Sequence, residues 1–185
     1  MRIKTVAEYE AVGPVKIEYD RLIENFGMVP NVTKVFSISP EIFQLHNEMY
    51  GKLMVEPSQL PKPVKQIIAL LVSAVNCCDY CLIWHSRFLM HLNVDDELID
   101  TIRRDFRQAP LDDKTMKLLE YVDCVARDSS AITDERVNAL ADCGFSDQEI
   151  LEVTTLVGYM SFLTRIINAL GVEIEPSQAG RTEQS

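Results

Sequence analysis

The chain contains 185 residues, of which 47% are hydrophobic and 25% are charged. This balance is typical of a soluble globular protein, and the length can support one domain with a substantial core. The formal net charge of −10 argues against nucleic acids and anionic membranes, because their phosphates would be repelled. We therefore expect neither a nucleic-acid partner nor a membrane partner.

The N-terminal segment and the apolar runs bear on the cellular compartment. Residues 1–5 contain no apolar segment of the kind found in signal peptides. The longest apolar run, residues 67–75, is too short to span a bilayer. We predict a cytoplasmic protein, in which cysteines are mostly reduced and a closely spaced pair is more often catalytic or metal-binding than a structural crosslink.

The apolar spacing along most of the chain is that of helices. Ser39 followed by Pro40 predicts one helix start, and Ser146 with Glu149 matches a capping box at another. No segment shows the sustained two-residue alternation of a strand. We therefore predict an all-α fold with helices near residues 15–26, 40–53, 64–75, 76–92, 95–106, 112–127, 133–144 and 146–170, and irregular ends at residues 1–14 and 173–185.

Two of these helices carry predictions about the core. The helix at residues 64–75 is apolar almost all round, which favours a buried position. Neighbouring amphipathic helices could leave part of it uncovered, and a symmetric interface between copies would then cover it. The helix at residues 40–53 has an apolar stripe that we expect to face inward, formed by Ile42, Phe43, Leu45, His46, Met49, Tyr50 and Leu53.

The residues that carry candidate chemistry are concentrated between Asn76 and His91. This stretch holds three of the five cysteines, two of the three histidines and the single tryptophan. Cys78, Cys81 and His85 have the offsets that place three side chains on one face of a helix. An imidazole beside two thiols can give or take a proton during sulfur chemistry. The pattern therefore indicates a redox-active dithiol.

The geometry expected for this stretch favours thiolate chemistry. Asn76 as an N-cap would place Cys77 and Cys78 in the first helical turn and Cys81 one turn further along. The unpaired N–H groups and the helix dipole stabilise an anion there by roughly 0.3–1 kcal/mol. Cys78 and Cys81 could then form an attacking and resolving pair that cycles through a sulfenic acid and a disulfide. Taken alone, this dipole argument makes Cys78 the more acidic thiol.

Other interpretations of the cysteine cluster have less support from the sequence. The side chains could form a buried helical cluster without chemistry. A zinc site would have only three plausible ligands, namely Cys77 or Cys78 together with Cys81 and His85, whereas a closed tetrahedral site needs four. Haem attachment would need a histidine directly after Cys81, where a leucine stands. We expect no cofactor and no metal.

Residues 67–76, followed by Cys78, Tyr80, Cys81 and His85, resemble the core of AhpD-like alkylhydroperoxidases, which belong to the carboxymuconolactone decarboxylase superfamily. The resemblance to the peroxidase-related branch of that superfamily covers most of the chain. Outside the core it rests on Pro30-Asn31, Ser39-Pro40, residues 144–150, Arg165 and residues 170–172.

The resemblance implies an AhpD-like helical bundle of about seven to nine helices that assembles into a homo-oligomer. We expect a single domain, residues 1–185, with the cysteine motif in a core at about residues 36–108 and C-terminal helices at about residues 111–172.

The resemblance also implies an activity and the roles of the site residues. It implies a peroxidase that reduces alkyl hydroperoxides or hydrogen peroxide with the cysteine pair. In that scheme Cys81 attacks the peroxide, Cys78 resolves the intermediate, and His85 belongs to a proton relay. The implied partners are a hydroperoxide substrate and a dithiol electron donor.

The chain departs from the pattern of that family at four positions, one of which is Thr164, where the family often has an asparagine. The relay usually begins with a glutamate twelve residues before the first cysteine, and here Gln66 stands there and cannot ionise. The residue before Cys78 is usually small, often glycine, and here it is Cys77. Some members have a histidine at the position of Tyr80. Cys77 and Tyr80 are therefore candidate accessory residues.

Gln66 keeps a second function under consideration. Without an ionisable group at this position the protein could be a disulfide reductase or a redox-sensing thiol protein with little peroxidase activity. A third interpretation, a carboxymuconolactone decarboxylase-like enzyme, is disfavoured because members of that branch generally lack the cysteine pair.

Overall fold

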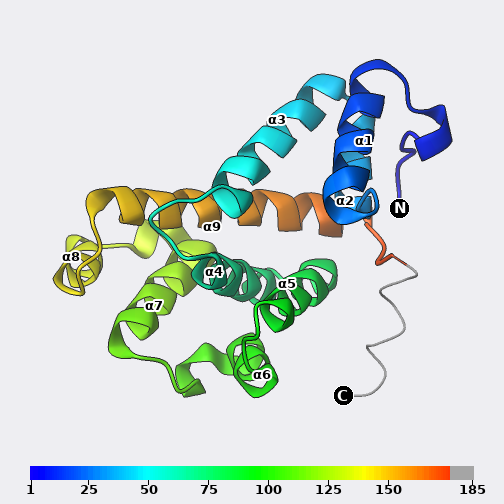
Figure 1. Cartoon of the computed structure of the whole chain (residues 1–185). Coiled ribbons are helices and arrows are strands. Elements are labelled where there is room, and N and C mark those ends of the chain that lie inside the picture. Colours follow the sequence, from blue (N-terminus) through cyan, green and yellow to red (C-terminus); the bar gives the residue numbers. More distant parts are fainter. Residues whose placement is uncertain (176–185) are drawn as a thin grey trace. The chain divides into compact units, whose positions relative to one another are not determined.

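The computed structural model describes residues 1–175, and within this part of the chain all regular structure is helical and no strand occurs. The prediction of an all-α fold is confirmed. The frayed tail predicted at residues 173–185 lies largely outside the described residues. The α-helices are α1 (Gly13–Phe26), α2 (Asn31–Lys34), α3 (Pro40–Tyr50), α4 (Lys62–Val75), α5 (Asp79–His91), α6 (Asp96–Asp105), α7 (Asp113–Asp128), α8 (Asp134–Asp142) and α9 (Asp147–Leu170) (Figure 1).

Shorter helical turns fill several of the connections. Residues 1–14 were expected to be irregular but contain η1, and α2 and η2 lie in residues 31–38, where no helix was predicted. These segments are too short to show a helical period, so the sequence pattern could not reveal them. The 3₁₀ turns are η1 (Glu8–Glu10), η2 (Val35–Ile38), η4 (Phe106–Gln108) and η5 (Ser129–Ala131), and η3 (Gly51–Val55) is a π-helix.

The chain divides into two compact units, one formed by Met1–Lys52 with Ile167–Ser185 and the other by Leu53–Ile166. The expectation of a single domain with a core at about residues 36–108 stays a prediction. In the first unit, α1 packs against α3 through an edge-to-face contact between Tyr19 and Phe43, with ring centroids 5.8 Å apart.

One face of α3 was predicted wrongly. Phe43 and His46 of the predicted inner stripe are buried, but Ile42, Leu45 and Met49 are exposed. His46 stacks on Phe36 at 4.2 Å between ring centroids, which fixes the rotation of the helix. The apolar residues of this helix cover more than one face, and periodicity alone does not determine which face packs against the rest of the unit.

The second unit is built around α4, which contacts α5, α6 and α7 (Figure 1). The predicted burial of α4 is confirmed, since most of its residues from Lys65 to Ser73 are inaccessible. Lys65 is only 1% exposed, and its Nζ lies 3.3 Å from Oε1 of Glu152 on α9 and donates to the carbonyl of Glu56 at 3.2 Å. This buried ion pair attaches the start of α4 to α9.

Several helices of the described chain are closed by a residue with a left-handed backbone. The helix starts follow equally local rules. Asp95 and Asp112 cap α6 and α7, and the predicted capping box of Ser146 and Glu149 forms before α9, with bonds of 2.8 and 3.3 Å. The left-handed residues are Gly27 after α1, Cys77 after α4, Asn93 after α5, Gly144 after α8 and Gly171 after α9, with φ angles of 74°, 50°, 59°, 82° and 61°.

The helix α9 is long and apolar enough to cross a membrane by length and composition alone. Core helices of soluble proteins meet the same criterion, and 44% of the apolar window is buried within the structure. With its compact helical units, the fold is consistent with a soluble protein. The cytoplasmic location stays a prediction.

Candidate functional site

The cysteine motif begins in the turn between α4 and α5. The backbone N–H of Cys77 donates to Ala74 at 3.2 Å and that of Cys78 donates to Ser73 at 3.0 Å. This pair of bonds is the Schellman pattern, in which the left-handed residue follows the C-cap. Asn76 is therefore the C-cap of α4, and the prediction that it caps α5 is wrong.

With Asn76 as the C-cap of α4, each cysteine lies earlier relative to the start of α5 than predicted. Cys78 itself is the N-cap of α5, and Cys81 lies in its first turn. Cys77 lies outside both helices, with its side chain exposed and φ at 50°. A sequence signal for this turn existed, because the resembled family often has glycine here and glycine is the residue best suited to a left-handed backbone.

The side chain of Asn76 fixes this turn to the neighbouring helix α9. Its Nδ2 donates to Thr164 Oγ1 at 3.0 Å and to Ser161 Oγ at 3.4 Å. Thr164 is fully buried, so the bond is shielded from water. Sequence reasoning did not find this contact, which joins residues 88 positions apart. Asn76 and Thr164 thereby set where the cysteine-bearing turn lies.

The two buried thiols form one hydrogen-bonded pair. Cys78 and Cys81 are both reduced and are 0% and 3% exposed. The hydrogen bond with the Cys81 thiol lowers the pKa of Cys78, although burial opposes the change. The same hydrogen bond, together with burial and the negative charge on Cys78, raises the pKa of Cys81. Within the pair, Cys78 therefore loses its proton more readily and Cys81 retains its proton.

His85 is held by the residue that replaces the family glutamate. Its Nδ1 lies 2.7 Å from Gln66 Oε1, and both side chains are buried. Because an amide oxygen only accepts, this contact assigns the proton of His85 to Nδ1 and leaves a lone pair on Nε2. Burial lowers the pKa of His85 to about 4, so the ring is neutral at pH 7.

The remaining accessory candidate, Tyr80, is buried at the start of an aromatic row along α5. Its ring lies 6.2 Å from that of Trp84, which lies 6.2 Å from that of Phe88. On a helix this row is adjacent to the row that contains Cys81 and His85. All six candidate residues therefore belong to α4, α5 and the turn between them, within one compact unit.

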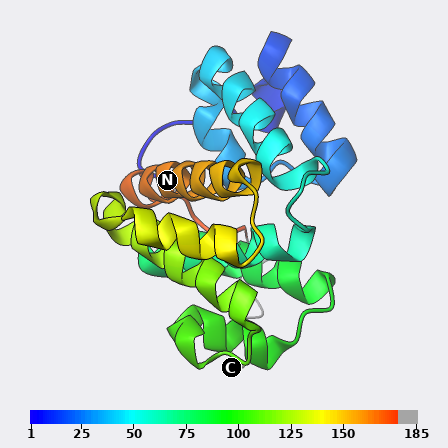
Figure 2. The same ribbon diagram turned by 90° about the vertical axis from the view of Figure 1, so that its left-hand side faces the viewer.

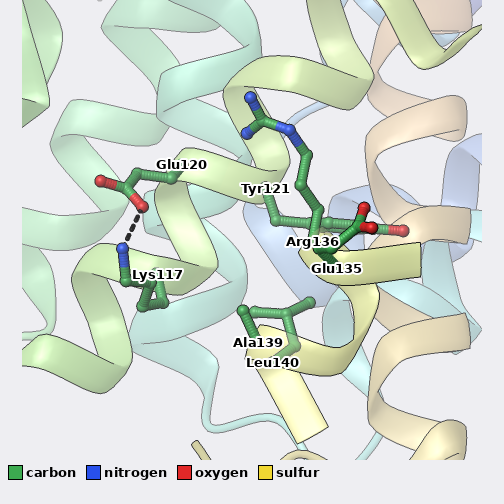
Figure 3. Close-up of a pocket in the computed structure, with 7 residues that line it drawn as sticks. All are labelled: Lys117, Glu120, Tyr121, Glu135, Arg136, Ala139 and Leu140. Atoms are coloured by element: carbon green, nitrogen blue, oxygen red, sulfur yellow. Dashed lines mark hydrogen bonds and ion pairs between the residues drawn. The ribbon is translucent and has the colours of Figure 1, made fainter. Parts of the chain in front are cut away.

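No group of three or more histidine, cysteine or acidic side chains in residues 1–175 is arranged to hold a metal ion. The hollow in Figure 3 has a volume of about 200 Å³. It lies between α7 and α8, which run side by side in Figure 2, and none of the candidate site residues line it. Its wall includes the ion pair of Lys117 and Glu120 at 2.8 Å.

The structure is that of an all-α protein with a buried dithiol at the start of helix α5. The model of the carboxymuconolactone decarboxylase family matches residues 40–123. This match includes α4, α5 and every candidate site residue. A search of curated proteins finds no significant match.

Solved structures with this fold include proteins described as peroxidase-related. An uncharacterised peroxidase-related protein from Silicibacter sp. is 28% identical over 95% of this chain and 94% of that chain, with a TM-score of 0.85. An AhpD-core peroxidase-related protein from Ralstonia eutropha is 19% identical over 95% and 93%, with a TM-score of 0.87. A debrominase solved with 2,3,4-tribromopyrrole is 16% identical over 94% and 92%, with a TM-score of 0.79.

The family match over residues 40–123 and the Silicibacter neighbour support the assignment of the chain to the AhpD-like and carboxymuconolactone decarboxylase superfamily. The resemblance drawn from the motif is confirmed at that level. This assignment relates the chain to a superfamily that includes enzymes.

Proposed function

We propose that the protein is a thiol-dependent peroxidase that reduces alkyl hydroperoxides or hydrogen peroxide through a Cys78/Cys81 dithiol–disulfide cycle. The single observation that carries the proposal is the buried pair itself, in which one sulfur is stabilised as a thiolate by the other. A thiolate is the nucleophilic form of cysteine, and a nearby second thiol can resolve the product.

The cycle conserves atoms and electrons. A thiolate attacks one peroxide oxygen, the O–O bond breaks, and the departing alkoxide takes a proton and leaves as an alcohol. The oxidised sulfur is now a sulfenic acid. The second sulfur attacks it, the S–S bond forms, and hydroxide takes a proton and leaves as water. A dithiol donor then returns two electrons and two protons to the pair.

His85 is suited to move these protons. Its Nε2 lone pair can accept a proton from a thiol while Gln66 Oε1 holds Nδ1–H at 2.7 Å. His85 follows Cys81 by one helical turn, a spacing that places the two Cβ atoms about 5–6 Å apart. A neutral imidazole acts first as a proton acceptor and afterwards, once protonated, as a donor to the leaving oxygen.

Two arguments differ on which sulfur attacks. The family resemblance assigns attack to Cys81, whereas the hydrogen bond within the pair lowers the pKa of Cys78 and raises that of Cys81, which favours Cys78 as the thiolate. Both orders end in the same disulfide. They differ in the position of the sulfenic acid, which a dimedone probe reports when the partner cysteine is replaced by serine. Labelling of Cys81 in the Cys78→Ser variant supports the resemblance, and labelling of Cys78 in the Cys81→Ser variant supports the resting charge.

Peroxide consumption in the presence of dithiothreitol tests the proposal. We expect the wild-type protein to consume cumene hydroperoxide catalytically, and the Cys78→Ser and Cys81→Ser variants to lose turnover. The matched control is Cys124→Ser, which removes a half-buried thiol on α7. A wild-type rate equal to that of dithiothreitol alone would contradict the proposal, as would equal loss of activity in the control.

One observation supports a second candidate, a disulfide reductase or redox sensor. The partner of His85 is an amide and not a carboxylate, so no buried negative charge assists proton removal. This candidate predicts a Cys78–Cys81 disulfide that exchanges readily with other disulfides while peroxide turnover stays near background. The decarboxylase interpretation has no comparable support from the site, because it leaves the dithiol without a role.

We further propose that the protein assembles into a homo-oligomer. Ile42, Leu45 and Met49 on α3 are 51%, 65% and 45% exposed, and a second copy would remove this apolar surface from water. Sedimentation velocity tests the proposal. We expect an oligomer for the wild-type protein and dissociation for Leu45→Glu, whereas a wild-type monomer at micromolar concentration would contradict it.

A further inference from the structure

The three thiols of the site differ in what can reach them. Cys78 and Cys81 are 0% and 3% exposed, whereas Cys77 is exposed. A hydroperoxide is small, but a bulky dithiol donor has to bring its own thiolate into line with an S–S bond. A disulfide between Cys78 and Cys81 is therefore poorly placed for direct attack by a protein donor. Electrons from such a donor need a point of entry.

Cys77 has a left-handed backbone, which is unusual for a cysteine. The other left-handed residues that close helices in residues 1–175 are Gly27, Gly144, Gly171 and Asn93. Glycine is the usual residue there because it has no β-carbon, and asparagine is tolerated because its short polar side chain can hydrogen-bond locally. Other side chains are penalised in the left-handed region. The side chain of Cys77 is exposed, so burial does not offset that penalty. Burial of the side chain therefore does not explain a cysteine at this position.

The same position is adjacent to the buried pair. Cys77 directly precedes Cys78, and the two N–H bonds of the turn hold their backbones to the end of α4, at 3.2 and 3.0 Å. A residue with an exposed thiol is thus joined by a peptide bond to a residue with a buried thiol.

We propose that Cys77 is the thiol through which a protein dithiol donor reduces the buried disulfide. This inference rests on the proposed dithiol cycle. The Cys77 thiolate attacks the Sγ of Cys78, the Cys78–Cys81 bond breaks, and Cys81 leaves as a thiolate and takes a proton. The product is a Cys77–Cys78 disulfide, so the oxidation has moved to the surface without any change in electron count.

The donor completes the transfer at the surface. Its first thiolate attacks the Sγ of Cys77, and Cys78 leaves as a thiolate. Its second thiol then displaces Cys77 and forms the oxidised donor, so two electrons and two protons have entered the protein. Adjacent Cα atoms are about 3.8 Å apart, less than the roughly 4.4–6.8 Å that disulfides prefer. The Cys77–Cys78 bond is therefore strained and easily reduced, as an intermediate should be.

The test uses the full-length protein and thioredoxin as the protein dithiol. Diamide first forms the Cys78–Cys81 disulfide, so that the reduction step is measured without peroxide. Cys77→Gly and Cys77→Asn are the test variants, because both residues suit the left-handed backbone and should leave the turn intact. Cys124→Ser is the control. Dithiothreitol serves as a small donor that needs no surface thiol.

We expect thioredoxin to reduce both Cys77 variants roughly tenfold or more slowly than the wild-type protein. Reduction by dithiothreitol should change much less, and the control should match the wild type. Thioredoxin that lacks its second motif cysteine should form a mixed disulfide that peptide mass mapping places on Cys77. A mixed disulfide on Cys78 or Cys81, none at all, or unchanged reduction of Cys77→Gly would overturn the proposal.

The relay and the peroxidase fail in different ways. If peroxide does not form the Cys78–Cys81 disulfide but the mixed disulfide on Cys77 still forms after diamide treatment, the peroxidase proposal is wrong and the relay is supported. If peroxide forms the disulfide and the Cys77 variants are reduced at the wild-type rate, the relay is wrong and the peroxidase is unaffected.

Discussion

Replacing Gln66 with glutamate should change the protonation state of His85. In the wild-type protein the ring is buried and its pKa is lowered to about 4, because no charge compensates an imidazolium there. The Gln66→Glu variant places a carboxylate at the same position, 2.7 Å from Nδ1 in the present geometry. A carboxylate at this distance favours the imidazolium form.

The size of the effect follows from the distance and the burial. Two unit charges 2.7 Å apart attract by about 6 kcal/mol at an effective dielectric constant of about 20. Part of this is lost because the carboxylate must also leave water. Neighbouring opposite charges typically shift a pKa by about 1–3 units. We therefore expect the apparent pKa of His85, coupled to the new carboxylate in the variant, to rise from about 4 to roughly 5–7.

Titration of the histidine ring signals by NMR measures this change directly, since the chain contains only 3 histidines. His85→Gln identifies the signal. Gln148→Glu is the matched control, because it adds the same charge at an exposed position. If proton transfer from a thiol limits turnover, the Gln66→Glu variant should also gain peroxidase activity, by up to roughly 10²–10⁴-fold. A wild-type ring that titrates near pH 6.5, or no rise in the folded variant, would refute the reasoning.

Three further predictions concern stability and positioning. Burial lowers the pKa of His46 to about 4, so the unfolded state binds more protons than the folded state below about pH 6.5. The free energy of unfolding should therefore fall by up to about 3 kcal/mol as the pH drops to 4. Urea unfolding at several pH values should show a smaller pH slope for His46→Gln than for the wild type. Lys65→Met should cost up to about 3 kcal/mol because it leaves the largely buried Glu152 carboxylate without a compensating charge, with the Ser58 hydroxyl still donating to it, and adding Glu152→Gln should recover part of the loss in urea unfolding. Thr164→Val should cost about 1 kcal/mol and shift the pH profile of Cys78 alkylation, whereas Thr164→Ser should restore both; an unchanged profile would show that the hydrogen bond to Asn76 does not position the thiolate.

The sequence predicted the long helices and the residue types of the site well because both depend on local information. Helical periodicity places the helices, and the spacing of Cys78, Cys81 and His85 places three side chains on one face. The pairing of His85 with Gln66 is less local. It was reached through the family resemblance, since a glutamine on a buried helix carries no signal of its own.

The sequence could not determine features for which two local arrangements are nearly equally favourable. Asn76 is as suitable for a C-cap as for an N-cap, and only the bonds made by the N–H groups of Cys77 and Cys78 decide between them. On α3 the apolar residues cover two faces, and the contacts of Phe43 and His46 select one. Contacts such as that of Asn76 with Thr164 join distant segments and have no signature in either segment alone.

The turn between α4 and α5 also changes how the thiolate is stabilised. His85 adds no positive charge there, because the buried ring is neutral and its partner Gln66 carries no charge. The negative charge of Asp79 next to the site opposes it. The hydrogen bond from Cys81 and the N-terminus of α5, which Cys78 itself caps, therefore supply the stabilisation. The first of these requires a donor at position 81. Oxidising Cys81, or replacing it with a residue that cannot donate a hydrogen bond, therefore removes the main cause of the acidity of Cys78, so the reactivity of each thiol depends on the state of the other.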